Sequence, residues 1–188
     1  MASSVKVNVP GAINVKISGM SGVSGLQSLG YTADGAEITF REFAIDVKSD
    51  RYGGEQGPNI EKQYLGMEAD IRLVMTEFNA EYIHFLQSRM PGVASIVAAP
   101  GKIATPGTLA FAGGGLIRCL LQGVLDAAAI VAGTAAGELL TPLNFPFCAV
   151  SDVVSYNAGT RYARANLTLK AYQGLVSSDI VLYNRVTS

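Results

Sequence analysis

The sequence predicts a mainly β protein, an antiparallel β-sandwich or partly closed barrel with one flanking α-helix and a long loop between two strands. Three observations lead to this prediction. Apolar and polar residues alternate along several stretches, as they do in strands that bury one face. Clusters of glycine, proline and asparagine separate these stretches. One segment, directly after Asn79, has apolar residues at helical spacing.

Composition favours one domain, 1–188, with much of its surface covered. The chain has 188 residues, and 49% are hydrophobic, so a sizeable core can form. Charged residues make up 15%, below the usual quarter, and the net charge is −1. A surface this poor in charge favours an oligomer. No basic cluster indicates direct affinity for nucleic acid.

The N-terminal segment 1–30 is expected to be an arm or connector, with a short strand near residues 13–17. Its second half, 18–30, is rich in glycine and serine, which is typical of a flexible connector. A strand is expected to begin at residues 29–32. It would pair with the next strand through Ala33-Asp34-Gly35, because Asp-Gly between alternating residues is a hairpin signal.

Two strands are predicted on either side of the long loop. In the first, 36–48, the apolar positions change from even to odd near Arg41–Glu42, which predicts a bulge there. The even apolar positions are Ile38 and Phe40, and the odd ones are Phe43, Ile45 and Val47. The second strand, 68–76, alternates without interruption and buries Ala69, Ile71, Leu73 and Met75.

The segment between these strands, 49–66, is predicted to be a protruding assembly loop. Its glycines and its proline oppose regular structure, and loops this long usually serve binding or lack order. A disordered hairpin tip is the simpler interpretation, but the large apolar and aromatic side chains favour contact with a neighbouring subunit. The candidate contact residues are Asp50, Arg51, Tyr52, Gly53, Gly54, Gly57, Pro58, Ile60, Tyr64 and Leu65.

A short helix is predicted next. Asn79 is a suitable N-cap, and Pro91–Gly92 would end the helix. Its apolar positions are Tyr82, Ile83, Phe85 and Leu86. The helix is so short that packing against the sheet must stabilise it.

The rest of the chain is expected to supply an insertion loop and further strands. The loop is 92–115, and strand-like or buried segments follow at 116–131 and 143–154. A turn is expected at 156–159. The stretch 161–172 alternates clearly and predicts a strand with one small apolar face, and residues 180–183 are expected to form a closing strand.

No residue pattern predicts catalysis, a metal site or a cofactor. Cys119 and Cys148 lie in apolar runs and are expected to be buried, with a single disulfide between them left open. His84 is the only histidine, which excludes a histidine-based metal cluster. The triple glycine 113–115 lacks the Gly-Lys-Ser/Thr ending of a phosphate loop. Neither a signal peptide nor a membrane-spanning helix is predicted.

The central region resembles the tail tube proteins of tailed bacteriophages. A strand leads into Asp46-Val47-Lys48-Ser49-Asp50, and Tyr52-Gly53-Gly54, Gly57-Pro58 and Leu65-Gly66 follow. A second strand, Ala69-Asp70-Ile71-Arg72-Leu73, then precedes the short helix. This resemblance covers roughly 40–90 in detail and the remainder only in general character.

The resemblance implies a structural virion protein without enzymatic activity, made in the host cytoplasm. Its subunits would form hexameric rings that stack into a tube, and the long loop would reach the neighbouring ring. Implied partners are further copies of the chain, a baseplate or tip protein, a terminator and, where present, a sheath. DNA would pass through without specific binding. Candidate lumen or ring-contact charges are Glu42, Asp46, Glu68 and Asp70.

Two alternatives stay open at this point. The first is another virion structural protein, such as a tail terminator, a connector or a capsid decoration protein. The second is an enzyme or ligand-binding β-barrel, for which scattered carboxylates could in principle form a catalytic pair. No specific spacing in the sequence supports that pair.

Overall fold

The computed structural model describes residues 3–9, 12–19, 25–48, 59–87, 116–123, 142–152, 155–158, 163–176 and 179–185. Within these ranges the protein is mainly β, as the sequence predicts, with a single helix. The strands are β1 (Ser3–Val9), β2 (Ile13–Ser18), β3 (Gln27–Lys48), β4 (Asn59–Phe78), β5 (Ile117–Gly123), β6 (Leu143–Val150), β7 (Ser155–Ala158), β8 (Ala163–Tyr172), β9 (Gly174–Val176), β10 (Asp179–Val181) and β11 (Asn184–Arg185), and the helix is α1 (Ala80–Gln87).

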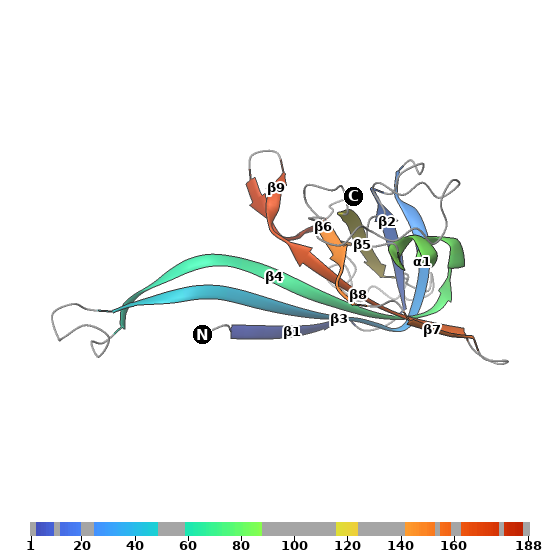
Figure 1. Ribbon diagram of the computed structural model, residues 1–188, viewed down its shortest axis with the longest axis horizontal. Coiled ribbons are helices and arrows are strands. Elements are labelled where there is room, and N and C mark those ends of the chain that lie inside the picture. Colours follow the sequence, from blue (N-terminus) through green and yellow to red (C-terminus); the bar gives the residue numbers. More distant parts are fainter. Residues whose placement is uncertain are drawn as a thin grey trace, which may run out of the picture.

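Six strands close into an antiparallel barrel in the order β6-β5-β2-β3-β4-β8 (Figure 1). Pairing between β6 and β8 closes it, so the barrel is complete where the sequence predicted a sandwich or a partly closed barrel. Inward-facing residues of all six strands fill the interior, as the pleat requires. Among the largest fully buried side chains are Ile13, Ile17, Leu29, Ile38, Ile71, Leu73, Met75, Ile117 and Phe145.

Strand β3 bends without turning back, and the hairpin predicted at Ala33-Asp34-Gly35 is wrong. Thr32 pairs with Met75 and Ala36 with Leu73, so three residues of β3 lie opposite Val74 alone. This bulge, with Gly35 at φ 86°, bends a single strand. The Asp-Gly pair therefore supplies the unusual backbone conformation of a bulge and not that of a two-residue hairpin.

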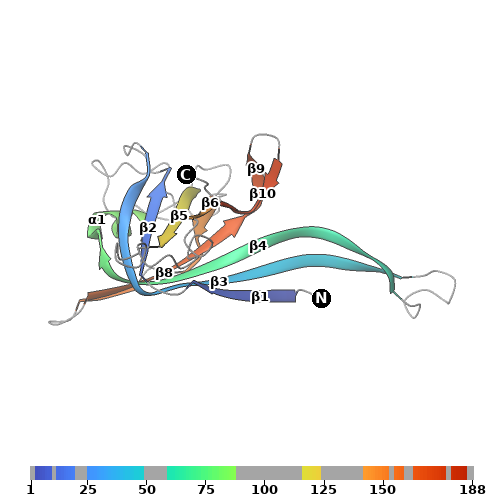
Figure 2. The same cartoon turned by 180° about the vertical axis from the view of Figure 1, so that it is seen from behind.

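The N-terminal segment runs along one edge of β3 on both sides of this bulge. Strand β2 pairs with residues 27–32 and β1 with residues 36–42, while β4 occupies the opposite edge throughout. The segment 1–30, expected as an arm or connector, thus contributes a barrel strand and a second strand outside the barrel (Figure 2).

The predicted helix is confirmed, including its cap. The Asn79 side chain accepts a hydrogen bond from the backbone N–H of Glu81 at 3.0 Å. The backbone N–H of Asn79 donates to the carbonyl of Leu29 at 2.8 Å, which ties the helix start to β3. Ile83 and Leu86 are buried in the barrel core, so packing stabilises this helix of 8 residues.

The C-terminal half confirms one strand pattern and corrects two other predictions. In β8, Ala165, Leu167, Leu169 and Ala171 are buried as the alternation predicts. Residues 155–158 form β7 and pair with β8, so the turn predicted at 156–159 does not begin at residue 156. The closing strand predicted at 180–183 is also wrong. Strand β10 pairs with β9, and the barrel is closed by pairing between β6 and β8. The predicted insertion loop 92–115 lies outside the described residues.

Both cysteines are free and fully buried, as expected for small core residues. Burial raises the pKa of Cys119 from 9.0 to about 12, because the thiolate loses its hydration. Burial and the neighbouring Cys119 raise the pKa of Cys148 as well. Each thiol therefore stays protonated in the fold at pH values where it ionises in the unfolded chain.

Stability is therefore expected to fall in alkaline solution. Because the folded-state pKa lies above the unfolded one, the stabilisation is complete below pH 9 and is lost as the pH rises toward 12. The free energy of unfolding should drop by up to about 1.4 kcal/mol per pH unit for each thiol. Urea unfolding between pH 8 and pH 11 measures this slope. The Cys119→Ala/Cys148→Ala variant is the control, since tyrosines and lysines titrate equally in both proteins, and equal slopes would contradict the assignment.

A charge in the barrel interior is expected to prevent folding. Ile71 is 0% exposed, so Ile71→Asp should cost about 4 kcal/mol or more by burying an unpaired carboxylate. Val74 on the same strand is 41% exposed, so Val74→Asp should melt close to the native protein. Circular dichroism during heating compares the two, and cooperative melting of a soluble Ile71→Asp protein would show that the assigned strand faces are reversed.

Candidate functional site

The hairpin of β3 and β4 extends beyond the barrel as an arm, defined here as residues 43–48 and 59–66 (Figure 1). These two segments pair with each other from Phe43–Gly66 to Lys48–Asn59. Strand β8 pairs with β4 only over residues 68–75, and β1 pairs with β3 only up to Glu42. The arm is therefore a two-stranded ribbon, a structure that is marginally stable in water unless it packs against something.

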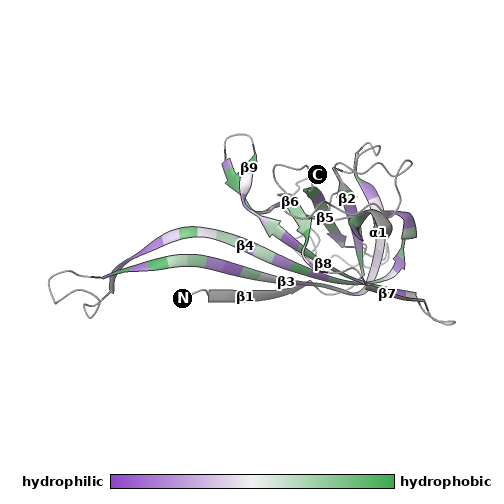
Figure 3. Cartoon of the chain, in the orientation of Figure 1, coloured by the Kyte–Doolittle hydropathy of each residue, from purple (hydrophilic) through white to green (hydrophobic). Residues whose placement is uncertain are grey.

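One face of the arm carries an apolar stripe, defined as Phe43, Ile45 and Val47. Their side chains are 41%, 53% and 36% exposed. Figure 3 shows hydrophobic residues recurring along this part of the hairpin. Single exposed apolar residues are ordinary, but a contiguous row on one face is typical of an interaction surface.

Along β3 the apolar residues change from the inward face to the outward face, and this change produces the stripe. The bulge predicted near Arg41–Glu42 is wrong. Pairing with β4 continues without a register shift from Ala36 to Phe43. Residues Ile38 and Phe40 consequently face the core while the odd positions face outward. The bulge lies in β4 instead, where Leu65 is the extra residue opposite the step from Phe43 to Ala44. The change of phase thus marks the border between barrel and arm.

Both edges of the arm lack a strand partner within the described part of the chain. The edge of β3 is open after Glu42, where β1 ends, and the edge of β4 is open before Glu68. Open edges present unpaired backbone N–H and C=O groups that recruit other strands. The arm therefore combines an exposed apolar face with two open edges.

The base of the arm contacts Gln173, the residue between β8 and β9. The Gln173 side chain donates a hydrogen bond to the Tyr64 hydroxyl at 2.8 Å. A Cβ at Gly66 would lie 3.0 Å from the Gln173 amide oxygen, so the close approach suits glycine. Gly174 lies against the ring of Phe147, where a Cβ would come within 2.3 Å. Gln173 therefore links the base of the arm to the start of the β9–β10 hairpin.

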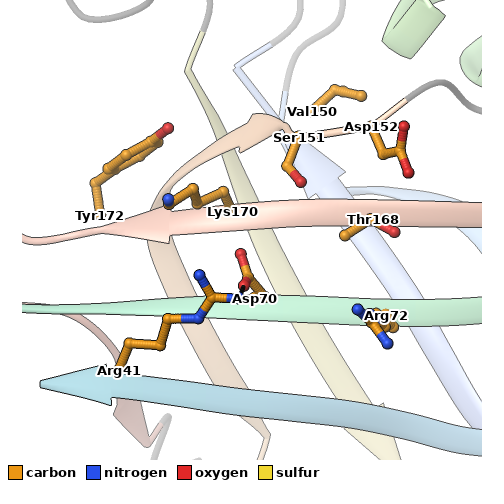
Figure 4. Close-up of a pocket in the computed structure, with 9 residues that line it drawn as sticks. All are labelled: Arg41, Asp70, Arg72, Val150, Ser151, Asp152, Thr168, Lys170 and Tyr172. Atoms are coloured by element: carbon orange, nitrogen blue, oxygen red, sulfur yellow. Dashed lines mark ion pairs between the residues drawn. The ribbon is translucent and has the colours of Figure 1, made fainter. Parts of the chain in front are cut away.

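A polar cleft of about 600 Å³ lies on the outer face of β3, β4 and β8 (Figure 4). Its lining residues are Arg41, Asp70, Arg72, Val150, Ser151, Asp152, Thr168, Lys170 and Tyr172. An ion-pair network crosses these strands: Arg41 contacts Asp70 at 2.8 Å, and Lys170 contacts Glu68 at 2.8 Å. The central carboxylates of β4 are thus matched by cations from both neighbouring strands.

Arg72 is the exception within the cleft. Its exposed guanidinium forms no ion pair with a described residue, whereas Arg41 and Lys170 each do. Its cross-strand neighbours are Glu37 on β3 and Thr168 on β8. Figure 4 shows Arg72 beside Thr168, at the end of the cleft away from Arg41 and Tyr172. An exposed cation without an anionic partner can bind an incoming carboxylate or phosphate.

The predicted loop 49–66 is shorter than expected, because β4 begins at Asn59. Ile60, Tyr64 and Leu65 are strand residues, and Tyr64 and Leu65 are 52% and 56% exposed. The other candidate contact residues lie outside the described residues, namely Asp50, Arg51, Tyr52, Gly53, Gly54, Gly57 and Pro58.

The four candidate charges lie on opposite faces of the β3–β4 hairpin. Glu42 and Asp46 share the face of Phe40, and Glu42 forms an ion pair with Lys62 at 2.9 Å. Glu68 and Asp70 face outward within the ion-pair network. One surface therefore cannot present all four residues.

Sequence reasoning missed the apolar stripe and Arg72. The sequence does contain a signal for the stripe, because the apolar positions change from even to odd near Arg41. Such a change fits a bulge, but it equally fits a regular strand whose apolar residues move from the inward face to the outward face. No local signal distinguishes Arg72 from the paired cations, since its isolation depends on pairing across three strands.

The described residues contain no cluster of histidine, cysteine and carboxylate side chains that could hold a metal ion. Nor does any helix among them have the length and apolar character needed to cross a bilayer. No protein-family model matches the chain, and no curated protein is significantly similar to it.

Proposed function

We propose that this protein is a structural subunit that self-assembles into stacked rings, forming a tube of the bacteriophage tail type through which DNA passes. The observation that carries the proposal is the arm, with its apolar stripe and two open edges. The resemblance of residues 40–90 to tail tube proteins gives the particular kind of assembly.

Assembly explains features that are costly in a monomer. Three exposed apolar side chains in a row lose contact with water when a second subunit covers them. Open edges gain backbone hydrogen bonds by accepting a further strand, which is the β-augmentation mode of recognition. The arm and the surface that receives it differ, so the contact is head-to-tail and can close into a ring.

Passage of DNA fits the overall charge of the chain, which is −1. A strongly basic channel would instead bind phosphate by releasing counterions. In this proposal the protein acts in the virion tail, beside baseplate, terminator and sheath proteins, after synthesis in the host cytoplasm.

Electron microscopy of the purified protein, with light scattering alongside, tests the assembly class. Open-ended rings or hollow tubes are the expected result. Trimers, or a protein that binds only to preformed capsids, would favour the decoration-protein alternative. A protein that stays monomeric over a wide range of concentration, with or without an initiating tail complex, would contradict the proposal.

Removing the apolar stripe is expected to block assembly and preserve the fold. The variant Phe43→Ser/Ile45→Ser/Val47→Ser loses apolar area at the contact, and the assembly threshold should rise by about a hundredfold or more. The matched control is Ala44→Ser/Asp46→Ser/Lys48→Ser on the opposite face of the same strand, which should assemble. Sedimentation measures both, and circular dichroism checks folding. Equal assembly of the two variants would exclude the stripe as a contact.

A further inference from the structure

We propose that the arm of one subunit docks on the outer sheet face of the next, with Glu61 of the arm forming an ion pair with Arg72. This inference rests on the proposed function, because it names the surface that receives the arm. The occupant is a second copy of the chain, and the contact is heterologous.

The arm presents one carboxylate beside its apolar stripe. Val47 and Glu61 are paired residues in the β3–β4 register, so their side chains stand next to each other on one face. Glu61 is exposed and forms no ion pair within the described chain. The docking face of the arm thus consists of apolar side chains with a negative charge at its outer end.

The outer face of the barrel sheet presents the complementary combination. Val74 is 41% exposed and lies two residues from Arg72, so both project from the same face of β4. Arg72 has no ion-pair partner among the described residues, and the nearby carboxylates Glu37 and Asp152 have interactions of their own. Val74 beside the cation Arg72 therefore complements the apolar stripe beside the anion Glu61.

Both surfaces are faces of β-sheet, so they can pack face to face at the usual separation of about 10 Å. The cleft beside Arg72 provides room for the Glu61 side chain. The ion-pair network of Arg41 and Lys170 does not compete, because those cations are already bound to Asp70 and Glu68. Docking would therefore pair Glu61 with Arg72, neither of which has an ion-pair partner among the described residues, and would cover the apolar stripe and Val74.

Charge reversal tests the pair in the full-length protein. Glu61→Lys and Arg72→Glu should each raise the assembly threshold by about tenfold or more, because each places like charges in contact. Combining both changes in one chain should restore assembly. Mixing the two single variants should also restore it, since copies can alternate so that every contact joins opposite charges. Charge-reversal controls on other elements, Glu81→Lys on α1 and Lys16→Glu on β2, should assemble normally.

The outcomes separate this contact from the proposed function. Tubes that form equally well from both single variants overturn the contact and leave tube assembly standing. Single variants that fail and are not rescued by mixing or by the double change also overturn the pair. A native protein that never assembles overturns both proposals.

A cysteine cross-link supplies an independent test of position. Mixed Val47→Cys and Val74→Cys proteins should form a disulfide between copies on mild oxidation, while buried Cys119 and Cys148 do not react. Asp46→Cys, on the opposite face of the arm, is the control partner for Val74→Cys. Equal cross-linking from positions 46 and 47 would contradict the assigned face.

Discussion

The structure depends on the long antiparallel pairing of β3 with β4. These strands of 22 and 20 residues pair from Gly30–Phe78 to Lys48–Asn59. Inside the barrel, β2 and β8 extend the sheet on either side, and the interior residues bury their side chains. Beyond the barrel only the hairpin continues. One ladder of backbone hydrogen bonds between β3 and β4 thus runs from the barrel into the arm. The barrel therefore sets the direction of the arm.

The alternation pattern predicted the strands well where one face meets the core. The residues of 68–76 and of β8 fulfil the pattern, because their inward positions face the apolar core of a closed barrel. The helix was equally predictable from Asn79 and its apolar spacing. The hairpin prediction failed at Gly35, because a glycine signals an unusual backbone angle but not how the fold uses it. Gly35 serves a bulge in a continuous strand, although Asp-Gly is more typical of a hairpin.

The candidate site was only partly predictable, for reasons of geometry. The apolar stripe lies in a segment that looks like any half-buried strand, and only the barrel boundary after Glu42 makes its outward face exposed. Arg41 contacts two carboxylates of β4, whereas the cross-strand neighbours of Arg72 are Glu37 on β3 and Thr168 on β8, which are far apart in the sequence. A periodic pattern identifies which residues share a face. It does not identify what covers that face.

The change of the apolar residues from the inward to the outward face of β3 also limits which insertions and deletions the gene can tolerate. Because side chains alternate with a period of two, inserting or deleting one codon between Phe40 and Phe43 would turn the stripe to the other face of the arm. A change of two codons would preserve the orientation and merely displace the stripe along the strand. Length variation between barrel and stripe should therefore accumulate in even steps, whereas single-residue substitutions of the outward side chains leave the phase intact.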